Sequence, residues 1–154
     1  MFRNKLAFFL AAGYLLVSLL AAGCGGGGGQ RIMGLSPSDT VKTFFDAAKN
    51  NQMSAAALYV SPSSANAQAA LNYMSGQNNL SNLQNYNLLS LNKVAEQGNF
   101  SVVVATLQEQ NSTKFTVKPV GLEKINGEWY IVDNNQIYSA AKYSILAQLL
   151  SKIQ

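Results

Sequence analysis

Apolar residues along this chain repeat with a helical period in one half and with a strand period in the other. Between residues 36 and 76 they recur at i, i+3, i+4 and i+7, which predicts amphipathic helices with one buried face. Between residues 87 and 133 they alternate with polar residues or fill short runs, which is typical of strands. We therefore predict an α+β fold, in which N-terminal helices pack on a curved antiparallel sheet and an extra helix follows at the C-terminus.

Serine-proline pairs predict where two of these helices begin. Ser36 can cap the first helix, Pro37 suits its first position, and Asp39 can complete a capping box. A second, short helix is expected at residues 53–60, and the pair at residues 61–62 starts a third. The spacing predicts three buried faces: Val41, Phe44, Phe45 and Ala48; Ala56, Tyr59 and Val60; and Ala67, Ala70, Leu71 and Met74.

Glycine and asparagine mark the turn between the first two expected strands. Gly98 and Asn99 form a two-residue hairpin signal between a strand at residues 87–97 and a strand at residues 100–108. Apolar residues occupy both faces of the second strand. We therefore expect a central strand that is covered on two sides.

The third expected strand, at residues 113–125, contains Pro119. Proline cannot donate a ladder hydrogen bond, so this position marks an edge, a bulge or a break. Asn126 and Gly127 then predict a type I′ turn, because both central residues of that turn need positive φ. A last strand follows at residues 128–133.

A long apolar segment ends the chain. Asn134 or Asn135 can cap a helix at residues 137–153, and a helix this apolar must bury one face. The domain core is the favoured place for that face, ahead of a partner subunit or the membrane. The predicted stripe is Tyr138, Ala141, Ile145, Leu149 and Ile153, widened by Ala140, Leu146 and Leu150.

The N-terminus has the pattern of a secretory signal. A basic start with Arg3 and Lys5 precedes an apolar run at residues 6–22, which ends in small residues. The end of this run, LLAAGC at residues 19–24, resembles the lipobox of bacterial lipoproteins. That resemblance implies cleavage between Gly23 and Cys24 and lipid on Cys24.

An uncleaved membrane anchor is the alternative, because 17 apolar residues lie at the lower limit of a bilayer span. The cysteine and the five glycines that follow it favour the lipoprotein. The predicted organisation is a signal peptide at residues 1–23, a lipidated cysteine and glycine-rich tether at 24–35, a domain at 36–133 and an amphipathic helix at 134–154.

Charge argues against a nucleic-acid partner. Without Arg3 and Lys5, the 11 basic residues of the chain fall to 9 against 7 acidic residues, and the lysines that remain are scattered. The 131 residues after position 23 have room for one ordinary domain.

Candidate chemistry is sparse. The chain has no histidine, so it has no Ser-His-Asp triad and no imidazole metal ligand. Its seven carboxylates lack the spacing of a metal-binding motif, and we predict no catalytic residue, no metal and no cofactor. Asp46 falls off the apolar face of its helix, which favours a surface carboxylate. Tyr59, Tyr73 and Tyr86 could line a pocket, although partly buried tyrosines usually serve packing.

Two segments resemble the nuclear transport factor 2-like superfamily, and in particular its bacterial lipoprotein members. One comprises residues 36–48 with 51–56, and the other comprises residues 121–132 with their NGEWY hairpin. The resemblance implies a cone-shaped cavity between the sheet and the first helices, used for small ligands, catalysis or dimer contacts. The residues that could line such a pocket are Phe44, Phe45, Tyr59, Tyr73 and Trp129.

These patterns together predict a function at a membrane. We expect a lipid-anchored, non-enzymatic binding module of the bacterial cell envelope, outside the cytoplasm, that binds a small apolar ligand or a protein partner. Gly25 after Cys24 is compatible with the periplasmic side of an outer membrane, where there are two membranes. Homodimerisation stays open. The alternatives are a cavity enzyme that uses a carboxylate and tyrosines, and an assembly protein that docks through its C-terminal helix.

Overall fold

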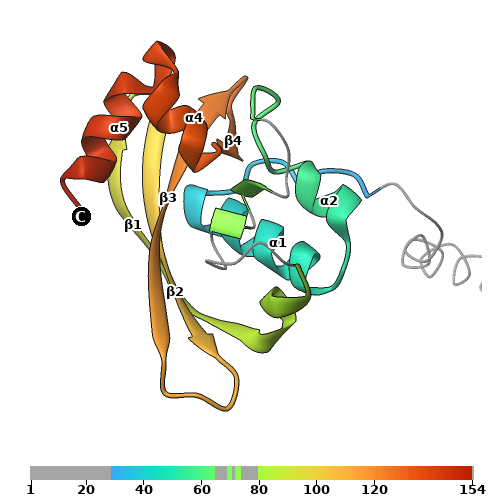
Figure 1. Ribbon diagram of the computed structural model, residues 1–154. Coiled ribbons are helices and arrows are strands. Elements are labelled where there is room, and N and C mark those ends of the chain that lie inside the picture. The colour runs from blue at the N-terminus through green and yellow to red at the C-terminus, as the bar shows by residue number, and fades with distance from the viewer. Residues whose placement is uncertain (1–28, 65–68, 71, 74–79, 154) are drawn as a thin grey trace, which may run out of the picture.

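The computed structural model describes residues 29–64, 69–70, 72–73 and 80–153. These residues form a four-stranded antiparallel sheet with helices on both faces (Figure 1). Helices α1 (Pro37–Lys49) and α2 (Met53–Ala57) lie on one side, and the C-terminal helices lie on the other. The predicted α+β class, with N-terminal helices on an antiparallel sheet and a helical C-terminus, is confirmed.

The sheet has the simplest antiparallel order, β1-β2-β3-β4, in which strands adjacent in sequence are adjacent in space. The predicted turn at Asn126 and Gly127 is confirmed, because both residues have positive φ, 52° and 89°. Gly98 in the first hairpin also has positive φ, 59°. The strands lie within two residues of their predicted limits: β1 (Tyr86–Gln97), β2 (Phe100–Glu109), β3 (Phe115–Ile125) and β4 (Glu128–Ile131).

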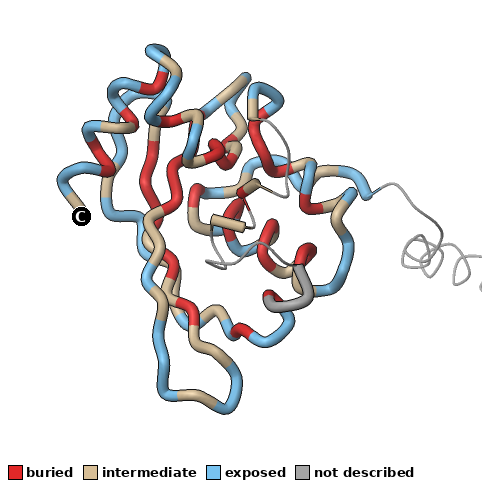
Figure 2. Tube along the Cα trace, in the orientation of Figure 1, coloured by how far each residue is buried: buried red, intermediate tan, exposed pale blue. Residues whose placement is uncertain are grey.

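Helix α1 begins where its capping residues predict. The Ser36 hydroxyl accepts a hydrogen bond from the Asp39 backbone N–H at 3.1 Å. The Asp39 carboxylate binds the Ser36 hydroxyl at 2.6 Å, so the reciprocal contact joins two side chains. The predicted face of Val41, Phe44, Phe45 and Ala48 is buried against the sheet (Figure 2).

The second helix is shorter than predicted. It ends at Ala57, and a turn then brings the next residues alongside β4. Ile131 donates its N–H to the Tyr59 carbonyl and accepts from the Ser61 N–H, each at 2.8 Å. Burial of Ala56, Tyr59 and Val60 is confirmed, although Tyr59 and Val60 belong to this paired segment and not to a helix.

The third predicted helix lies mostly outside the described residues. Residues 69–70 and 72–73 are helical, and Ala70 is buried as predicted. Ala67, Leu71 and Met74 lie outside the described ranges.

Strand β2 is the covered central strand that its two apolar faces predict. Val103, Ala105 and Leu107 join the core cluster under α1. Val102 joins a second cluster, which the C-terminal helices form on the opposite face. Among the described strands, Pro119 of β3 pairs only with β2, because β4 first pairs with β3 at Leu122, so this proline occupies an edge.

The single C-terminal helix predicted at residues 137–153 is wrong. The segment consists of α4 (Asn134–Ser139), a 3-10 turn (Ala141–Tyr143) and α5 (Ser144–Ser151). Ala140 interrupts it with extended backbone, φ −105° and ψ 124°. The helix cap is Asp133 and not Asn134 or Asn135, since an Asp133 carboxylate oxygen accepts from the Asn135 N–H at 3.2 Å.

This interruption changes which side chains face the sheet. Of the predicted stripe, Tyr138, Ala141 and Ile145 are exposed, whereas Leu149 is buried. The break at Ala140 turns the following residues, and Tyr143 becomes fully buried. The predicted burial of the segment against the domain core is nevertheless confirmed. Its buried side chains are Ile137, Tyr143, Leu146, Leu149 and Leu150.

Candidate functional site

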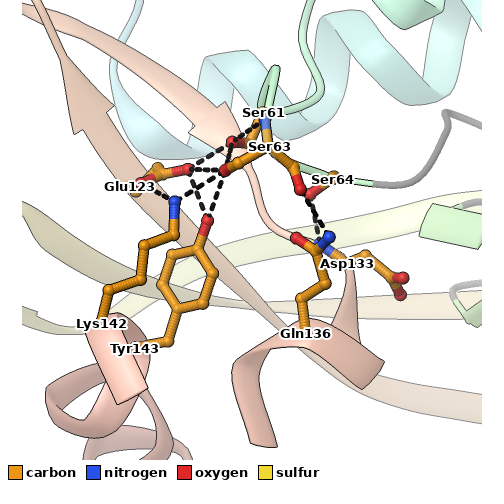
Figure 3. Close-up of polar contacts among 8 residues, drawn as sticks. All are labelled: Ser61, Ser63, Ser64, Glu123, Asp133, Gln136, Lys142 and Tyr143. Carbon is orange, nitrogen blue, oxygen red and sulfur yellow. Dashed lines mark hydrogen bonds and ion pairs between the residues drawn. The ribbon is translucent and has the colours of Figure 1, made fainter. Parts of the chain in front are cut away.

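A buried carboxylate lies where the second face of the sheet meets the C-terminal segment. Glu123 of β3 is 8% exposed and faces the side of the sheet that α4 and α5 cover. The loop after α2 brings Ser61 and Ser63 to it, and the 3-10 turn brings Lys142 and Tyr143 (Figure 3). We call these five residues the polar clasp.

Three hydroxyl groups meet one oxygen of this carboxylate. Tyr143 donates its hydroxyl to Glu123 Oε1 at 2.7 Å, and Ser61 donates its hydroxyl to the same oxygen. The Ser63 hydroxyl lies 3.2 Å away. The other oxygen, Oε2, lies 3.7 Å from the Lys142 ammonium. An ionised carboxylate accepts such bonds without needing a donor of its own.

Each hydroxyl group of the polar clasp has a hydrogen-bond acceptor for its single hydrogen. A serine or tyrosine hydroxyl has a single hydrogen to donate. Ser61 and Tyr143 use theirs on Glu123, and the Lys142 ammonium donates to the Ser63 oxygen at 2.7 Å. Ser63 Oγ lies 2.7 Å from Ser61 Oγ and 2.8 Å from the Tyr143 hydroxyl oxygen, so its hydrogen completes the network. The clasp is internally satisfied.

Ser63 and Lys142 are residue types that can serve as a nucleophile and its general base. Lys142, however, is in the wrong protonation state to act as a base. A general base needs a pKa near the working pH. The hydrogen bond of Lys142 with Tyr143 and the nearby Glu123 carboxylate raise the pKa of Lys142 above its ordinary value of 10.5. At neutral pH this lysine is an ammonium that donates to Ser63, and it cannot take the serine proton.

Two further hydrogen bonds tie the same loop to the start of α4. The Asp133 N–H donates to the Ser64 hydroxyl at 2.9 Å, and the Gln136 amide donates to the Ser63 carbonyl at 2.5 Å (Figure 3). Residues 61–64 are therefore bound to β3, to α4 and to the 3-10 turn. The arrangement joins segments that are distant in sequence.

A second polar site holds the N-terminal segment to the domain. The Arg31 guanidinium carbon lies 4.0 Å from the ring centre of Tyr130 and 4.9 Å from that of Tyr59. Arg31 donates to the carbonyls of Leu58 and Trp129, each at 2.5 Å. Its guanidinium also lies 3.9 Å from Glu128. We call Arg31 with these partners the arginine clamp.

Four of the five residues predicted to line a pocket are in one core cluster, and the fifth, Tyr73, packs against that cluster. Phe44, Phe45, Tyr59 and Trp129 are buried together in the core cluster under α1. Tyr73 is half-buried beside the β3 edge, where its hydroxyl donates to the Pro119 carbonyl at 2.8 Å. Burial raises the pKa of Tyr73. Pocket lining stays a prediction for all five.

Other predicted positions have simpler outcomes. Cys24 and Gly23 lie outside the described residues. The Asp46 carboxylate is a solvent-facing group that pairs with Lys42 at 2.5 Å, one helical turn away. Among the described residues, no group of three or more histidine, cysteine, aspartate or glutamate side chains could hold a metal ion. Over the same residues, each helix is too short or too polar to cross a membrane.

The polar clasp was missed by sequence reasoning. Glu123 alternates with the apolar residues of β3, so its place on a strand could be read, but its burial depends on what covers that face. The break at Ala140 decides this, because it turns Tyr143 toward the sheet. The sequence signal for a buried polar site was a charged residue, Glu123, on a strand face that helices cover.

No protein-family model matches this chain, and no curated protein is significantly similar to it.

Proposed function

We propose that this protein is a bacterial cell-envelope lipoprotein that acts as a non-enzymatic interaction module for a protein partner. Lipid on Cys24 holds it to the membrane with its domain outside the cytoplasm, on the periplasmic side of the outer membrane where there are two. The basic start, the apolar run and the lipobox-like LLAAGC support this location. Two or more acyl chains suffice for stable anchoring.

The main support for the interaction role is an exposed part of the sheet. On the face opposite α1, Phe115 and Val117 are 59% and 60% exposed. The half-buried Val104 and Thr106 of β2 lie on the same face, and Thr106 pairs with Val117. In Figure 1 the C-terminal helices cover the other end of this face and leave this end open. We call these four residues the open sheet face.

Exposed apolar surface on a strand favours a macromolecular partner. Such patches mark interaction sites when they are contiguous, and among the described strands none pairs with the outer edge of β3 at Val117. A small apolar ligand is less well supported, because Phe44, Phe45 and Trp129 already pack together in the core. The partner version of the binding role is therefore the one we favour.

We also propose that the domain has a nuclear transport factor 2-like fold. The packing of α1 and α2 on one face of the antiparallel sheet supports a nuclear transport factor 2-like fold, which would add a cone-shaped cavity between α1 and the sheet. An experimental structure with a bound apolar molecule in that space would support this assignment. A solid core there would contradict it.

Site-specific photo-crosslinking in living cells tests the interaction role. A photoreactive side chain replaces Val117 in the open sheet face, and the matched variant carries it at Val94, an exposed apolar position on β1. We expect one reproducible adduct from position 117 and none of that mass from position 94. Its mass identifies a second copy of this chain or another protein.

Other outcomes of this experiment are equally informative. Equal labelling from both positions, or none from either, would overturn the docking role of the open sheet face. Native mass spectrometry of the full chain complements it, because an added small mass lost on denaturation would favour a ligand-binding module instead.

A cavity enzyme is the second candidate, because Glu123 and Tyr143 bring a carboxylate and a phenol hydroxyl together. The saturated hydrogen bonds of the clasp and the protonated Lys142 weigh against it. Turnover of any substrate by the full chain that is lost in Glu123→Gln, while the fold is kept, would establish it.

An assembly protein that docks through its C-terminal helix is the least supported alternative. The apolar side chains of α5, including Leu146 and Leu150, already pack on the sheet. We expect deletion of residues 137–153 to unfold the domain, as judged by circular dichroism. A folded variant that had lost a partner would revive this alternative.

A further inference from the structure

Two consecutive apolar side chains near the end of the predicted tether, residues 24–35, are exposed. Ile32 is 55% exposed and Met33 is 65% exposed. Scattered apolar residues on a protein surface are ordinary. Ile32 and Met33 differ from such scattered residues in two ways. Hydrogen bonds fix their backbone, and they lie close in sequence to the proposed lipidation site, Cys24.

Hydrogen bonds hold the backbone on both sides of the pair. The arginine clamp fixes Arg31 directly before it, and the Ile32 N–H donates to the Tyr59 hydroxyl at 3.1 Å. After the pair, the Gly34 N–H lies 3.0 Å from each oxygen of the Glu128 carboxylate. The two side chains point outward from a pinned segment, so they cannot reach the core by a local rearrangement.

The pair is close to the proposed lipid along the chain. Ile32 follows Cys24 by eight residues, which span at most about 28 Å when fully extended. Two large apolar side chains are thus held within a short reach of the bilayer surface.

We propose that Ile32 and Met33 insert into the boundary between the headgroups and the acyl chains of the bilayer that carries the anchor. This inference rests on the proposed lipidation of Cys24. Apolar groups at such an interface bury to a depth of about 5–10 Å. The contact orients the domain on the membrane, because the arginine clamp joins the segment that carries the inserted pair to the end of α2 and to β4.

The proposed contact sets which side of the domain faces outward. The N-terminal segment lies on the α1 side of the sheet, where Leu35 packs against the core cluster. The open sheet face lies on the opposite side (Figure 1). Insertion of Ile32 and Met33 therefore leaves the open sheet face directed away from the membrane and free for a partner.

Fluorescence quenching in vesicles tests the contact on the full lipidated chain. Cys24 is the only cysteine, so Met33→Cys introduces a thiol that bimane can label once Cys24 carries lipid. The vesicles contain phosphatidylethanolamine and phosphatidylglycerol, with a fraction of lipid carrying a nitroxide just below the headgroup. The matched control is Val94→Cys on β1, an exposed apolar position far from the tether in sequence.

We expect nitroxide lipid to quench the label at position 33 at least about twofold more than the label at position 94. Adding Ile32→Asp to the Met33→Cys variant should lower this quenching, because a carboxylate resists entry into the interface. Emission from Trp129, the only tryptophan, should stay unchanged and so report an intact fold.

The outcomes separate this inference from the proposed function. Equal quenching at positions 33 and 94 on a chain whose intact mass includes lipid would overturn the membrane contact alone. An intact mass without lipid would overturn the anchor and the contact together. Quenching at position 33 that Ile32→Asp leaves unchanged would also overturn the contact, since mere proximity would explain it.

Discussion

The two faces of the sheet are closed by different kinds of contact. Under α1 the core is apolar, and Phe44 and Phe45 pack there on Val103 and its neighbours in β2. On the opposite face a smaller apolar cluster adjoins the polar clasp around Glu123. One face is held by packing, and the other combines packing with directed hydrogen bonds.

The two kinds of contact contribute differently. Apolar packing mainly stabilises the fold, whereas directed hydrogen bonds orient the C-terminal segment. Apolar burial is nondirectional and scales with the area removed from water. A buried carboxylate costs desolvation, which its hydrogen bonds must offset, and those bonds have fixed geometry. We therefore expect the α1 face to supply most of the folding free energy, and the clasp to fix where the C-terminal segment lies.

The largest expected effect tests the apolar face. Phe44→Ala should lower the free energy of unfolding by about 3–5 kcal/mol, because it leaves a cavity in a packed core. Urea unfolding followed by Trp129 fluorescence measures it. The matched control is Phe115→Ala, the same change at an exposed position of β3. A comparable loss in that control would show that burial under α1 is not the decisive difference.

The next effect tests the clasp. Glu123→Gln replaces an acceptor by an amide whose hydrogens face donors, and should cost about 1–3 kcal/mol. Trypsin should then cut faster after Lys142, because the 3-10 turn is released. Glu96→Gln, at an exposed ion pair with Lys93, is the matched control and should change neither readout appreciably. Unchanged cleavage after Lys142 in Glu123→Gln would contradict the orienting role.

Sequence reasoning succeeded where structure depends on local periods. The face of α1, the limits of the strands and the Asn126-Gly127 turn follow from spacing and backbone preference within a few residues. It failed where a distant contact decides. Tyr59 leaves the helical path to bind Ile131, and Tyr143 reaches Glu123 only because the chain breaks at Ala140.

The candidate sites also differ in whether the sequence alone can predict them. The arginine clamp joins residue 31 to residues 58 and 129, and the clasp joins residues 61, 123 and 143. No short motif encodes such pairings, since each partner is an ordinary residue in its own segment. The lipobox-like signal is the reverse case, because all its information lies within six adjacent residues.

A smaller effect tests how closely the C-terminal segment packs. A Cβ atom added at Gly121 would lie 2.7 Å from Ile137 Cδ1 and 3.0 Å from Leu146 Cδ2. Gly121→Ala should therefore cost about 1 kcal/mol, since the ends of side chains can partly move. Adding Ile137→Val removes the closest methyl group and should recover part of that loss in a double-mutant cycle. Strictly additive losses would show that the two sites do not touch.

The smallest effect concerns the dependence of the clasp on pH. The folded state raises the pKa of Lys142, mainly through its hydrogen bond with Tyr143. The stabilisation is therefore complete below the unfolded value of 10.5 and is lost as the pH rises through the folded value. Because half of this side chain is exposed, we expect less than about 1 kcal/mol.

Comparison with Lys142→Met isolates this contribution, because burial raises the pKa of Tyr73 and acts in the same direction. The stability difference between the wild type and Lys142→Met, from urea unfolding, should shrink between about pH 9 and pH 12. In a Tyr143→Phe background the same difference should be smaller at pH 9 and nearly flat. A difference that persists to high pH would mean that Lys142 stabilises the turn through its alkyl stem, and that the charge in the clasp contributes nothing measurable.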